Sequence, residues 1–227
     1  MKTLSAANAE KAFVYELNEG RLIKCAKLIS SMPVGAMLDI GCTQGDWGLY
    51  WQDRGWKVFG VDINSSNVIA SNKAGLDASL CDCNSEKLPF QDKSFNFIFA
   101  GEVIEHLVDT DGFIDEIYRC LIPGGQAIIT TPNLASFENR MRLLLGFYPL
   151  WVDYSLDGTG HVRAYTPRVL KRQLTHRGFK IKKHLGNWVP FVPQKYIDDV
   201  RHPWMSVTGD VFPSLSMDIM LLVERPL

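Results

Sequence analysis

The nine residues from Met37 to Gly45, Met-Leu-Asp-Ile-Gly-Cys-Thr-Gln-Gly, constrain the fold more than any other stretch of the chain. A short apolar run ends there at two glycines four positions apart, Gly41 and Gly45, which is typical of a buried strand that leads into a turn. Without a Cβ, glycines let backbone N–H groups approach a bound molecule, and a nucleotide-like ligand suits such a turn. Asp39 lies inside the run and needs a partner or a ligand, because burying an isolated carboxylate is costly. The alternative is a simple strand-to-helix connection whose glycines serve close packing.

Length and composition favour a single globular domain over residues 1–227, with an inserted lid. The formal net charge of -1 gives no strong signal for nucleic acid or for an anionic membrane. Five cysteines lack the paired spacing of metal fingers, which favours reduced thiols in a cytoplasmic protein. We find no signal peptide and no apolar run long enough for a transmembrane segment, so a cytoplasmic location is expected.

Predicted strands alternate with predicted helices along the chain. Apolar residues at helical spacing predict leading helices within residues 1–31, and Thr166 and Pro167 predict the start of a helix that ends near His176. Further helices are expected at residues 46–54, 64–74 and 135–145, and strands around 37–40 and at 57–61, 77–81, 94–100, 126–131, 179–185 and 216–223. This alternation predicts an α/β fold with a mostly parallel, doubly wound sheet and helices on both faces.

Asp62 ends the second predicted strand, seventeen positions after Gly45. In dinucleotide-binding sheets an acidic residue about twenty positions past the glycine turn accepts hydrogen bonds from ribose hydroxyls. The alternative role of Asp62 is to cap the next helix, which Ser65 or Ser66 could also do. Ligands of parallel sheets bind at the carboxyl ends of the strands. The residues that fall at or near those ends are Asp39, Gly41, Asp62, Asp82, Gly101, Glu102 and Pro132.

A second group of polar residues follows the fourth predicted strand, in Glu102-Val-Ile-Glu105-His106. If a helical turn begins at Glu102, then Glu102, Glu105 and His106 share one face. Two carboxylates and an imidazole suit Mg, Mn or Zn, and His161 could add a ligand from beyond the lid. The alternatives are that Glu102 merely neighbours the cofactor, that Glu105 caps a helix, and that His106 is a base or a core residue.

Two segments, 134–165 and 187–213, are too long and too aromatic for ordinary connections, and we expect them to form the lid and acceptor side of the site. The second of them carries four prolines and is expected to be irregular. Aromatic side chains in these segments could line a pocket for an apolar or aromatic small molecule, or could simply pack the lid. They are Phe137, Phe147, Tyr148, Trp151, Tyr154 and Trp188.

Together these motifs resemble the class I S-adenosylmethionine-dependent methyltransferases of type 11/23, across residues 32–223. The segment Leu38 to Gly45 is similar to their first motif, although Thr43 stands where the middle glycine usually lies. The resemblance implies a Rossmann-like sheet of seven strands with one antiparallel strand. It places Gly41 and Gly45 at the methionine part of S-adenosylmethionine, Asp62 at the ribose and Asp82 at the adenine amino group. The cofactor-binding residues it implies are Asp39, Gly41, Cys42, Gly45, Asp62, Ile63, Asp82, Cys83, Gly101 and Glu102.

The second motif is similar to that of ubiquinone-biosynthesis O-methyltransferases and of small-RNA 2′-O-methyltransferases. In those proteins a Glu-x-x-Glu-His motif and a later histidine are associated with a metal at the acceptor hydroxyl. The resemblance therefore implies His106, His161 and Glu105 as catalytic residues, and Glu102, Glu105, His106 and His161 as ligands of a divalent metal (Mg, Mn or Zn).

The sequence thus predicts methyl transfer to a small-molecule acceptor, with O-methylation favoured, by a monomer or a homodimer. RNA 2′-O-methylation is one alternative, since basic residues could form a local face. These are Arg140, Arg142, Arg163, Arg168, Lys171, Arg172 and residues 180–183. A non-catalytic module that keeps the cofactor pocket is the other alternative.

Overall fold

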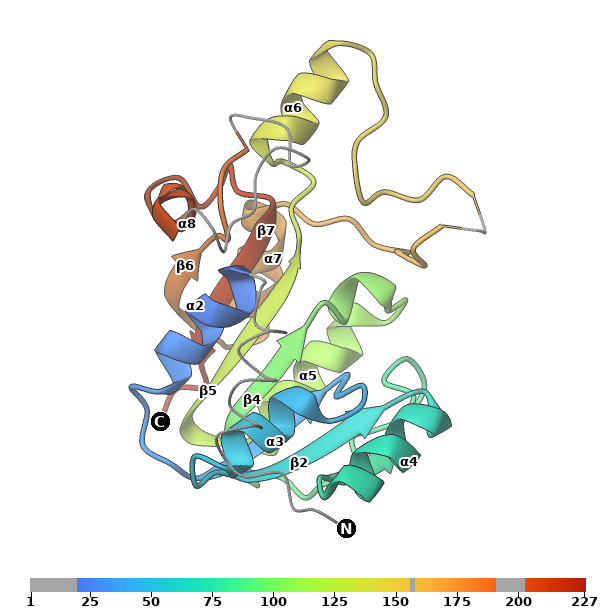
Figure 1. Ribbon diagram of the computed structural model, residues 1–227, viewed down its shortest axis with the longest axis vertical. Helices are drawn as coiled ribbons and strands as arrows, with labels where there is room; N and C mark the ends of the chain where they lie inside the picture. The colour runs from blue at the N-terminus through green and yellow to red at the C-terminus, as the bar shows by residue number, and fades with distance from the viewer. Residues whose placement is uncertain (1–19, 156–157, 191–202) are drawn as a thin grey trace.

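The computed structural model of this protein describes residues 20–155, 158–190 and 203–227. Seven strands form one sheet in the order β3-β2-β1-β4-β5-β7-β6 (Figure 1). The strands are β1 Ala36–Ile40, β2 Lys57–Asp62, β3 Asp77–Leu80, β4 Phe95–Gly101, β5 Leu121–Pro132, β6 Lys180–Leu185 and β7 Asp218–Glu224. Strand β7 is antiparallel to both β5 and β6, whereas β1 to β5 pair in parallel. The predicted mostly parallel, doubly wound sheet with one antiparallel strand is confirmed.

Helices cover both faces of this sheet. They are α2 Gly20–Ile29, α3 Asp46–Gln52, α4 Ser65–Ala74, the 3-10 helix η1 Ile104–His106, α5 Thr110–Cys120, α6 Phe137–Leu144, α7 Pro167–His176 and α8 Pro203–Val211. Helix α7 begins as predicted, because the Thr166 side chain accepts a hydrogen bond from the Val169 N–H and Pro167 occupies the first turn. Of the leading helices expected in residues 1–31, α2 is described and the remainder lies outside the described residues.

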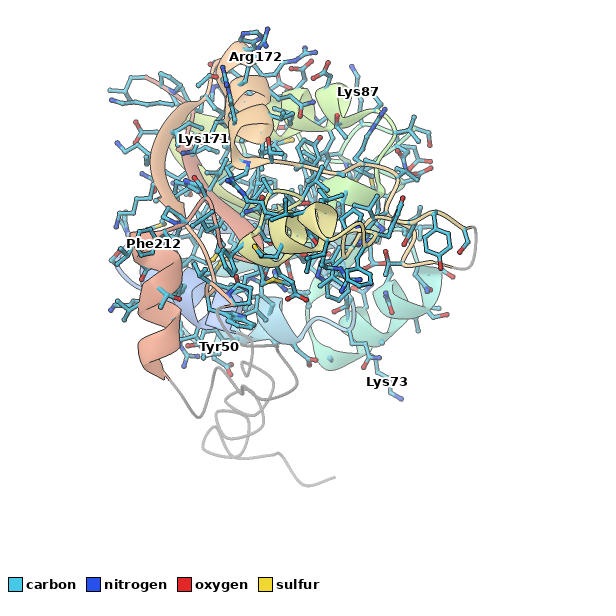
Figure 2. The ribbon with its side chains drawn as sticks, turned by 90° about the horizontal axis from the view of Figure 1, so that it is seen from above. Tyr50, Lys73, Lys87, Lys171, Arg172 and Phe212 are labelled. Carbon is cyan, nitrogen blue, oxygen red and sulfur yellow. The ribbon has the colours of Figure 1, made fainter. Side chains whose placement is uncertain are left out.

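Helix α8 corrects the expectation that residues 187–213 are irregular. Its prolines do not prevent a helix, because Pro203 stands at the first helical position and Pro213 follows the last turn. Lys24 ties α8 to α2 on the same face of the sheet, where its ammonium donates to the carbonyl of Ser206 and to the Asp210 carboxylate. Figure 2, seen from above, shows Lys171 and Arg172 on the α7 side of the molecule and Phe212, just after α8, on another side.

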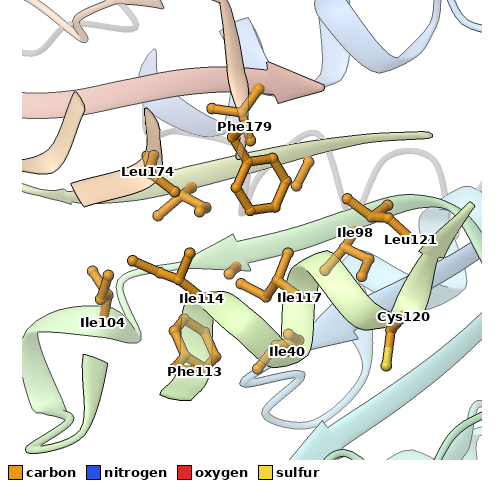
Figure 3. Packing of buried hydrophobic residues seen from close by; sticks show 14 of the residues in the cluster. Ile40, Ile98, Ile104, Phe113, Ile114, Ile117, Cys120, Leu121, Leu174 and Phe179 are labelled. Atoms are coloured by element: carbon orange, nitrogen blue, oxygen red, sulfur yellow. The ribbon is translucent and has the colours of Figure 1, made fainter. Parts of the chain in front are cut away.

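The face of the sheet under α5 and α7 buries aliphatic side chains and a few phenylalanines (Figure 3). Phe113 and Ile117 lie four positions apart on α5 and are almost fully buried, as are Leu174 of α7 and Phe179 after it. Burial of one such side chain contributes about 1.5–3 kcal/mol to folding. This layer holds the carboxyl end of β4 rigidly in place, because the buried Ile104 of η1 belongs to the same cluster.

The opposite face packs tryptophans against phenylalanines of β4. Trp47 and Trp51 of α3 meet edge to face with ring centroids 5.7 Å apart, and Trp47 lies 4.8 Å from Phe99. Trp56 and Phe97 also meet edge to face, with ring centroids 6.0 Å apart. These rings anchor α3 directly behind the turn that follows β1, so the turn is fixed on both sides by packed structure.

Helix α6 and the connection that follows it project beyond the sheet, at the end where the carboxyl tip of β5 lies (Figure 1). Ser136 caps α6 by accepting a hydrogen bond from the Asn139 N–H. The described part of residues 145–164 contains no helix or strand. None of the described helices is long and apolar enough to span a membrane.

Candidate functional site

The turn after β1 brings backbone groups of the predicted glycine motif against the end of β2. The N–H groups of Gly41 and Cys42 both donate to the Val61 carbonyl, at 2.8 and 3.1 Å. Gly41 has φ of 76°, and a Cβ there would lie 2.8 Å from Val103 Cγ2. A larger residue at position 41 would therefore be strained and would collide with the residue that follows Glu102.

Gly45 has a different environment, although the sequence motif pairs it with Gly41. It caps α3 with φ of 92°, and a Cβ there would meet Ser71 Oγ at 3.2 Å and Leu76 Cδ2 at 3.3 Å. Gly45 thus serves close packing of α3 against α4, which was the alternative interpretation of the motif. Cys42 also points into this layer, since its buried Sγ lies 3.9 Å from Ser71 Oγ. Only the backbone of Cys42 faces the turn.

Asp62 ends β2 and is buried, and its carboxylate organises the edge of the sheet. Oδ2 accepts from the Thr43 N–H at 2.9 Å, and Oδ1 accepts from the Asn64 N–H at 2.8 Å and from Asn67 Nδ2 at 3.1 Å. The helix cap is Asn64, whose side chain accepts from the Ser66 N–H, so Asp62 is not used as the cap. A carboxylate has about four acceptor positions, and one position on Oδ2 is left for a further donor.

Asp39 is 3% exposed, and its Oδ2 has no hydrogen-bond partner among the described residues. Burial, followed by the nearby Asp62 carboxylate, raises the pKa of Asp39 well above its usual range. An unpartnered buried carboxyl next to a second acid is costly unless a positive group or a donor lies against it. The strand end is therefore suited to a ligand that carries a cationic group.

Asp82 follows β3, the next strand along this edge. Its Oδ1 accepts from the Asn84 N–H at 2.9 Å and its Oδ2 from Ser85 Oγ at 2.8 Å, so the carboxylate closes a tight turn. A hydrogen bond between the flanking thiols lowers the pKa of Cys81 and raises that of Cys83. All five cysteines are free, in agreement with the prediction of reduced thiols. Ile63 is 65% exposed and offers an apolar surface beside Asp62.

The Glu102 carboxylate is held apart from the rest of its motif. The backbone of Glu102 has φ of 56°. Its Oε1 accepts a hydrogen bond from Thr130 Oγ1 at 2.8 Å and lies 3.7 Å from an Nη atom of Arg21. The helical turn begins at Ile104 and not at Glu102, so the expected common face of Glu102, Glu105 and His106 is wrong. Neighbouring Gly101 has no room for a Cβ, which would lie 2.7 Å from the Phe99 ring.

Glu105 is 1% exposed and points toward the lid. Its Oε2 accepts from Thr131 Oγ1 at 3.0 Å, whereas Oε1 has no partner among the described residues. Burial, and secondly the charge of Glu102, raises the pKa of Glu105 to about 8. The backbone carbonyl of Glu105 accepts from the N–H groups of Val162 and Arg163, which joins η1 to the segment after the lid.

His106 and His161 lie edge to face with ring centroids 4.8 Å apart. His106 Nδ1 lies 3.1 Å from the Gly160 carbonyl, and His161 Nδ1 lies 3.0 Å from the Trp151 carbonyl. When each Nδ1 donates to its carbonyl, both Nε2 atoms are acceptors. One donor atom from each of Glu105, His106 and His161 lies within 4.8 Å of the other two. This cluster of three residues, which excludes Glu102, is the group of the described residues suited to a metal ion.

The lid carries His161 into place through a carboxylate that the sequence analysis missed. Asp153 accepts from the His161 N–H at 2.9 Å and from Thr159 Oγ1 at 3.1 Å. Thr131, which orients Glu105, was missed as well. The adjacent threonines before Pro132 at a strand end were the available signal for Thr131, whereas no local pattern marks Asp153.

A small cavity of about 10 Å³ opens beside the cluster, and one water molecule would fill it. Glu105, His161, Leu150 and Trp151 contribute to its lining. The other predicted aromatics lie elsewhere: Phe147, Tyr148 and Tyr154 are exposed, and Trp188 is buried against Met217. Phe137 of α6 is half-buried, so of the six predicted aromatic side chains, all within the described residues, Trp151 alone lines the cavity.

Comparisons with known proteins show the family of this chain. Residues 16–184 match the sequence profile of a family described as a methyltransferase domain. The chain is 29% identical to a malonyl-[acyl-carrier protein] O-methyltransferase of Serratia marcescens, over 61% of this chain and 51% of that protein. It is 34% identical to the ubiquinone biosynthesis O-methyltransferase of Nitrobacter winogradskyi, over 66% of this chain and 58% of that protein.

The chain spans about half the length of these curated relatives. Among solved structures, a SAM-dependent methyltransferase from Archaeoglobus fulgidus superposes with a TM-score of 0.64 at 18% identity, over 92% of this chain and 93% of that one. At this identity the superposition shows the fold alone, and the family is shown by the sequence match.

Proposed function

Since this chain belongs to the S-adenosylmethionine-dependent methyltransferase family, we propose that it methylates a hydroxyl oxygen of a small, apolar or aromatic acceptor. The observation that carries the proposal is the cluster of Glu105, His106 and His161, which places two imidazoles and a buried carboxyl beside a cavity at the carboxyl end of β4. A hydroxyl acceptor must lose its proton, and this cluster supplies groups that can take it. An amine or a carbon acceptor would need less of this machinery.

The residues at the ends of β1, β2 and β3 fit S-adenosylmethionine, which supplies an electrophilic methyl group on a positively charged sulfur. The unpartnered Asp39 Oδ2 suits the cationic groups of the cofactor, and Gly41 keeps the turn open where a Cβ would collide with Val103. Asp62 has one acceptor position left for a ribose hydroxyl, and Asp82, together with the exposed Ile63 that follows Asp62, would hold the adenine. These residues bind and orient, and orientation can supply about 7–11 kcal/mol of the barrier.

The proton of the acceptor goes to Nε2 of His106 or His161 in this proposal. The Gly160 and Trp151 carbonyls hold the two Nδ1 atoms, which fixes the tautomer that leaves Nε2 free to accept. A placed general base contributes typically about 10²–10⁴-fold to the rate. The buried Glu105 stabilises the imidazolium that forms, once it is ionised.

A divalent metal bound by Glu105, His106 and His161 would lower the pKa of the hydroxyl instead. The unpartnered Glu105 Oε1 and the two Nε2 acceptors fit such an ion, and a set of two imidazoles and one carboxylate suits Zn or Mn better than Mg. Titration of Zn²⁺ or Mn²⁺ into the purified chain would test this: we expect one site per chain, lost in His161→Ala. Activity that is unchanged after chelation would leave the histidines as the base.

The cofactor is tested by isothermal titration of S-adenosylhomocysteine, and the acceptor by transfer of a labelled methyl group to a panel of phenols. We expect one binding site per chain and turnover that depends on His106 and His161. A folded chain that binds neither S-adenosylmethionine nor S-adenosylhomocysteine contradicts the proposal. Binding without turnover on any acceptor would favour the non-catalytic module.

Methylation of an RNA 2′-hydroxyl is the second candidate. A groove of about 620 Å³ runs beside α7 and includes Arg163, Arg172 and Arg177. Arg177 is already paired with Asp111 and Asp115, which reduces the charge available to a phosphate backbone. RNA binding should weaken steeply with salt if this groove is used, and binding that is independent of salt would count against it.

A further inference from the structure

The connection after α6 carries an exposed apolar surface that the methyl-transfer site leaves unused. Residues 143–152 contain no charged side chain. Five large side chains within residues 143–148, which we name the apolar tip, are exposed to solvent. They are Leu143 (55%), Leu144 (77%), Leu145 (65%), Phe147 (60%) and Tyr148 (48%). Single exposed apolar residues are ordinary on a protein surface, but a contiguous group of this kind marks an interaction site.

The apolar tip occupies the part of the molecule that projects farthest from the sheet. Helix α6 and the following connection extend away from the strands in Figure 1, and no other labelled helix lies beside them there. A protrusion of leucine, phenylalanine and tyrosine suits insertion into the interface of a bilayer, where aromatic rings with a polar edge are enriched.

Two arginines stand at the base of the tip. Arg140 Nε donates to the Ala135 carbonyl and Arg142 Nε donates to the Tyr148 carbonyl, both at 2.8 Å. These bonds fix the stems of the side chains and use only the Nε atoms, so the terminal nitrogens can reach lipid phosphates. Two acids lie near these arginines in the sequence: Glu138 stands in the first turn of α6, away from the tip, and Asp153 accepts from the His161 and Thr159 donors. Basic residues that flank an apolar segment favour an anionic lipid surface.

We propose that the apolar tip docks this protein on an anionic lipid bilayer, with Arg140 and Arg142 at the phosphates. The same connection continues to Leu150 and Trp151, which line the cavity beside Glu105 and His161.

Cosedimentation with vesicles tests the docking surface directly. The full chain is mixed with vesicles of phosphatidylcholine alone and of phosphatidylcholine with phosphatidylglycerol. We expect binding to the anionic vesicles, and a loss of at least about tenfold in the partition coefficient when Leu144→Ser and Phe147→Ser are combined. Ile69→Ser is the matched control, because Ile69 on α4 is 67% exposed and lies far from α6. The proposal is overturned if the wild-type chain binds neither kind of vesicle, or if the double variant binds anionic vesicles as well as the wild type does.

A second copy of the chain is the competing occupant of the tip. Sedimentation velocity without lipid should show no association that depends on Leu144 and Phe147. A dimer that the double variant dissociates, together with no vesicle binding, would assign the tip to self-association and overturn lipid docking. Titration with S-adenosylhomocysteine separates this result from the proposed function, because the double variant should bind that ligand as the wild type does.

Discussion

The cofactor side and the acceptor side of the site are built in different ways. On the cofactor side, Asp62 is held by the Asn64 N–H and Asp82 by the Asn84 N–H, each two positions along the chain. On the acceptor side, His106 meets His161, which lies 55 positions later and is carried by the lid. The first half is therefore set by the ends of packed strands, whereas the second half depends on how the lid is folded. Binding of the cofactor and transfer of the proton should respond to different substitutions.

The largest effect is expected from His161→Ala combined with His106→Ala. Removing both Nε2 acceptors takes away the general base, so kcat should fall by about 10²–10⁴-fold. The affinity for S-adenosylhomocysteine, measured by titration calorimetry, should stay the same because neither side chain belongs to the strand ends that hold the cofactor. If the double variant also loses affinity for S-adenosylhomocysteine, the histidines contribute to cofactor binding and the two sides of the site are not independent.

Asp62→Ala is expected to weaken S-adenosylhomocysteine binding by roughly 10–100-fold, the range for a hydrogen bond to a charged group. The variant loses the acceptor for the Thr43 N–H and for a ribose hydroxyl together. Asp62→Asn separates these effects, since its amide oxygen can replace one of them. Circular dichroism controls for folding, and unaltered affinity in the folded Ala variant would place the ribose elsewhere.

Asp153→Ala should lower kcat, or the affinity for a metal, by roughly 10–100-fold through the loss of the contact that orients His161. Asp153→Asn keeps an acceptor oxygen and should rescue most of the activity. Binding of S-adenosylhomocysteine should not change in either variant. Equal activity of the Ala variant and the wild type would mean that the lid positions His161 without this carboxylate.

A pH dependence of stability is expected in addition, and it involves neither cofactor binding nor turnover. The pKa of Glu105 is about 8 in the folded chain, above its ordinary value of 4.5, so the folded state holds a proton that the unfolded state has lost between these values. The contribution is fully present below about pH 4.5 and falls by up to about 1.4 kcal/mol per pH unit until about pH 8. Denaturant titrations of Glu105→Gln should show a shallower decline than those of the wild type, because the raised pKa of Asp39 still contributes, whereas Glu138→Gln should keep the full decline. If the free energy of unfolding depends on pH in the same way in Glu105→Gln and in the wild type, the raised pKa of Glu105 is contradicted.

The strands and turns of the cofactor side could be predicted from the sequence because their signals are local. The apolar runs, the glycine turn and Asp62 each follow from patterns within about twenty residues, and the sheet order brings them together. The sequence could not predict that Glu102 would turn toward Thr130, since the left-handed backbone at position 102 and a contact 28 positions away leave no local pattern. The role of Asp153 depends on a contact across the lid that no periodicity records. Helix α8 was also missed, because a cluster of prolines predicts irregular structure unless they fall at the ends of a helix, as Pro203 and Pro213 do.

Titration of S-adenosylhomocysteine into the wild-type chain tests the central claim most directly, namely that the ends of β1, β2 and β3 hold the methyl donor. We predict saturation at one ligand per chain, and loss of binding in Gly41→Val, whose side chain would collide with Val103. A folded wild-type chain that gives no binding, or a folded Gly41→Val variant that binds as tightly as the wild type, would contradict the account.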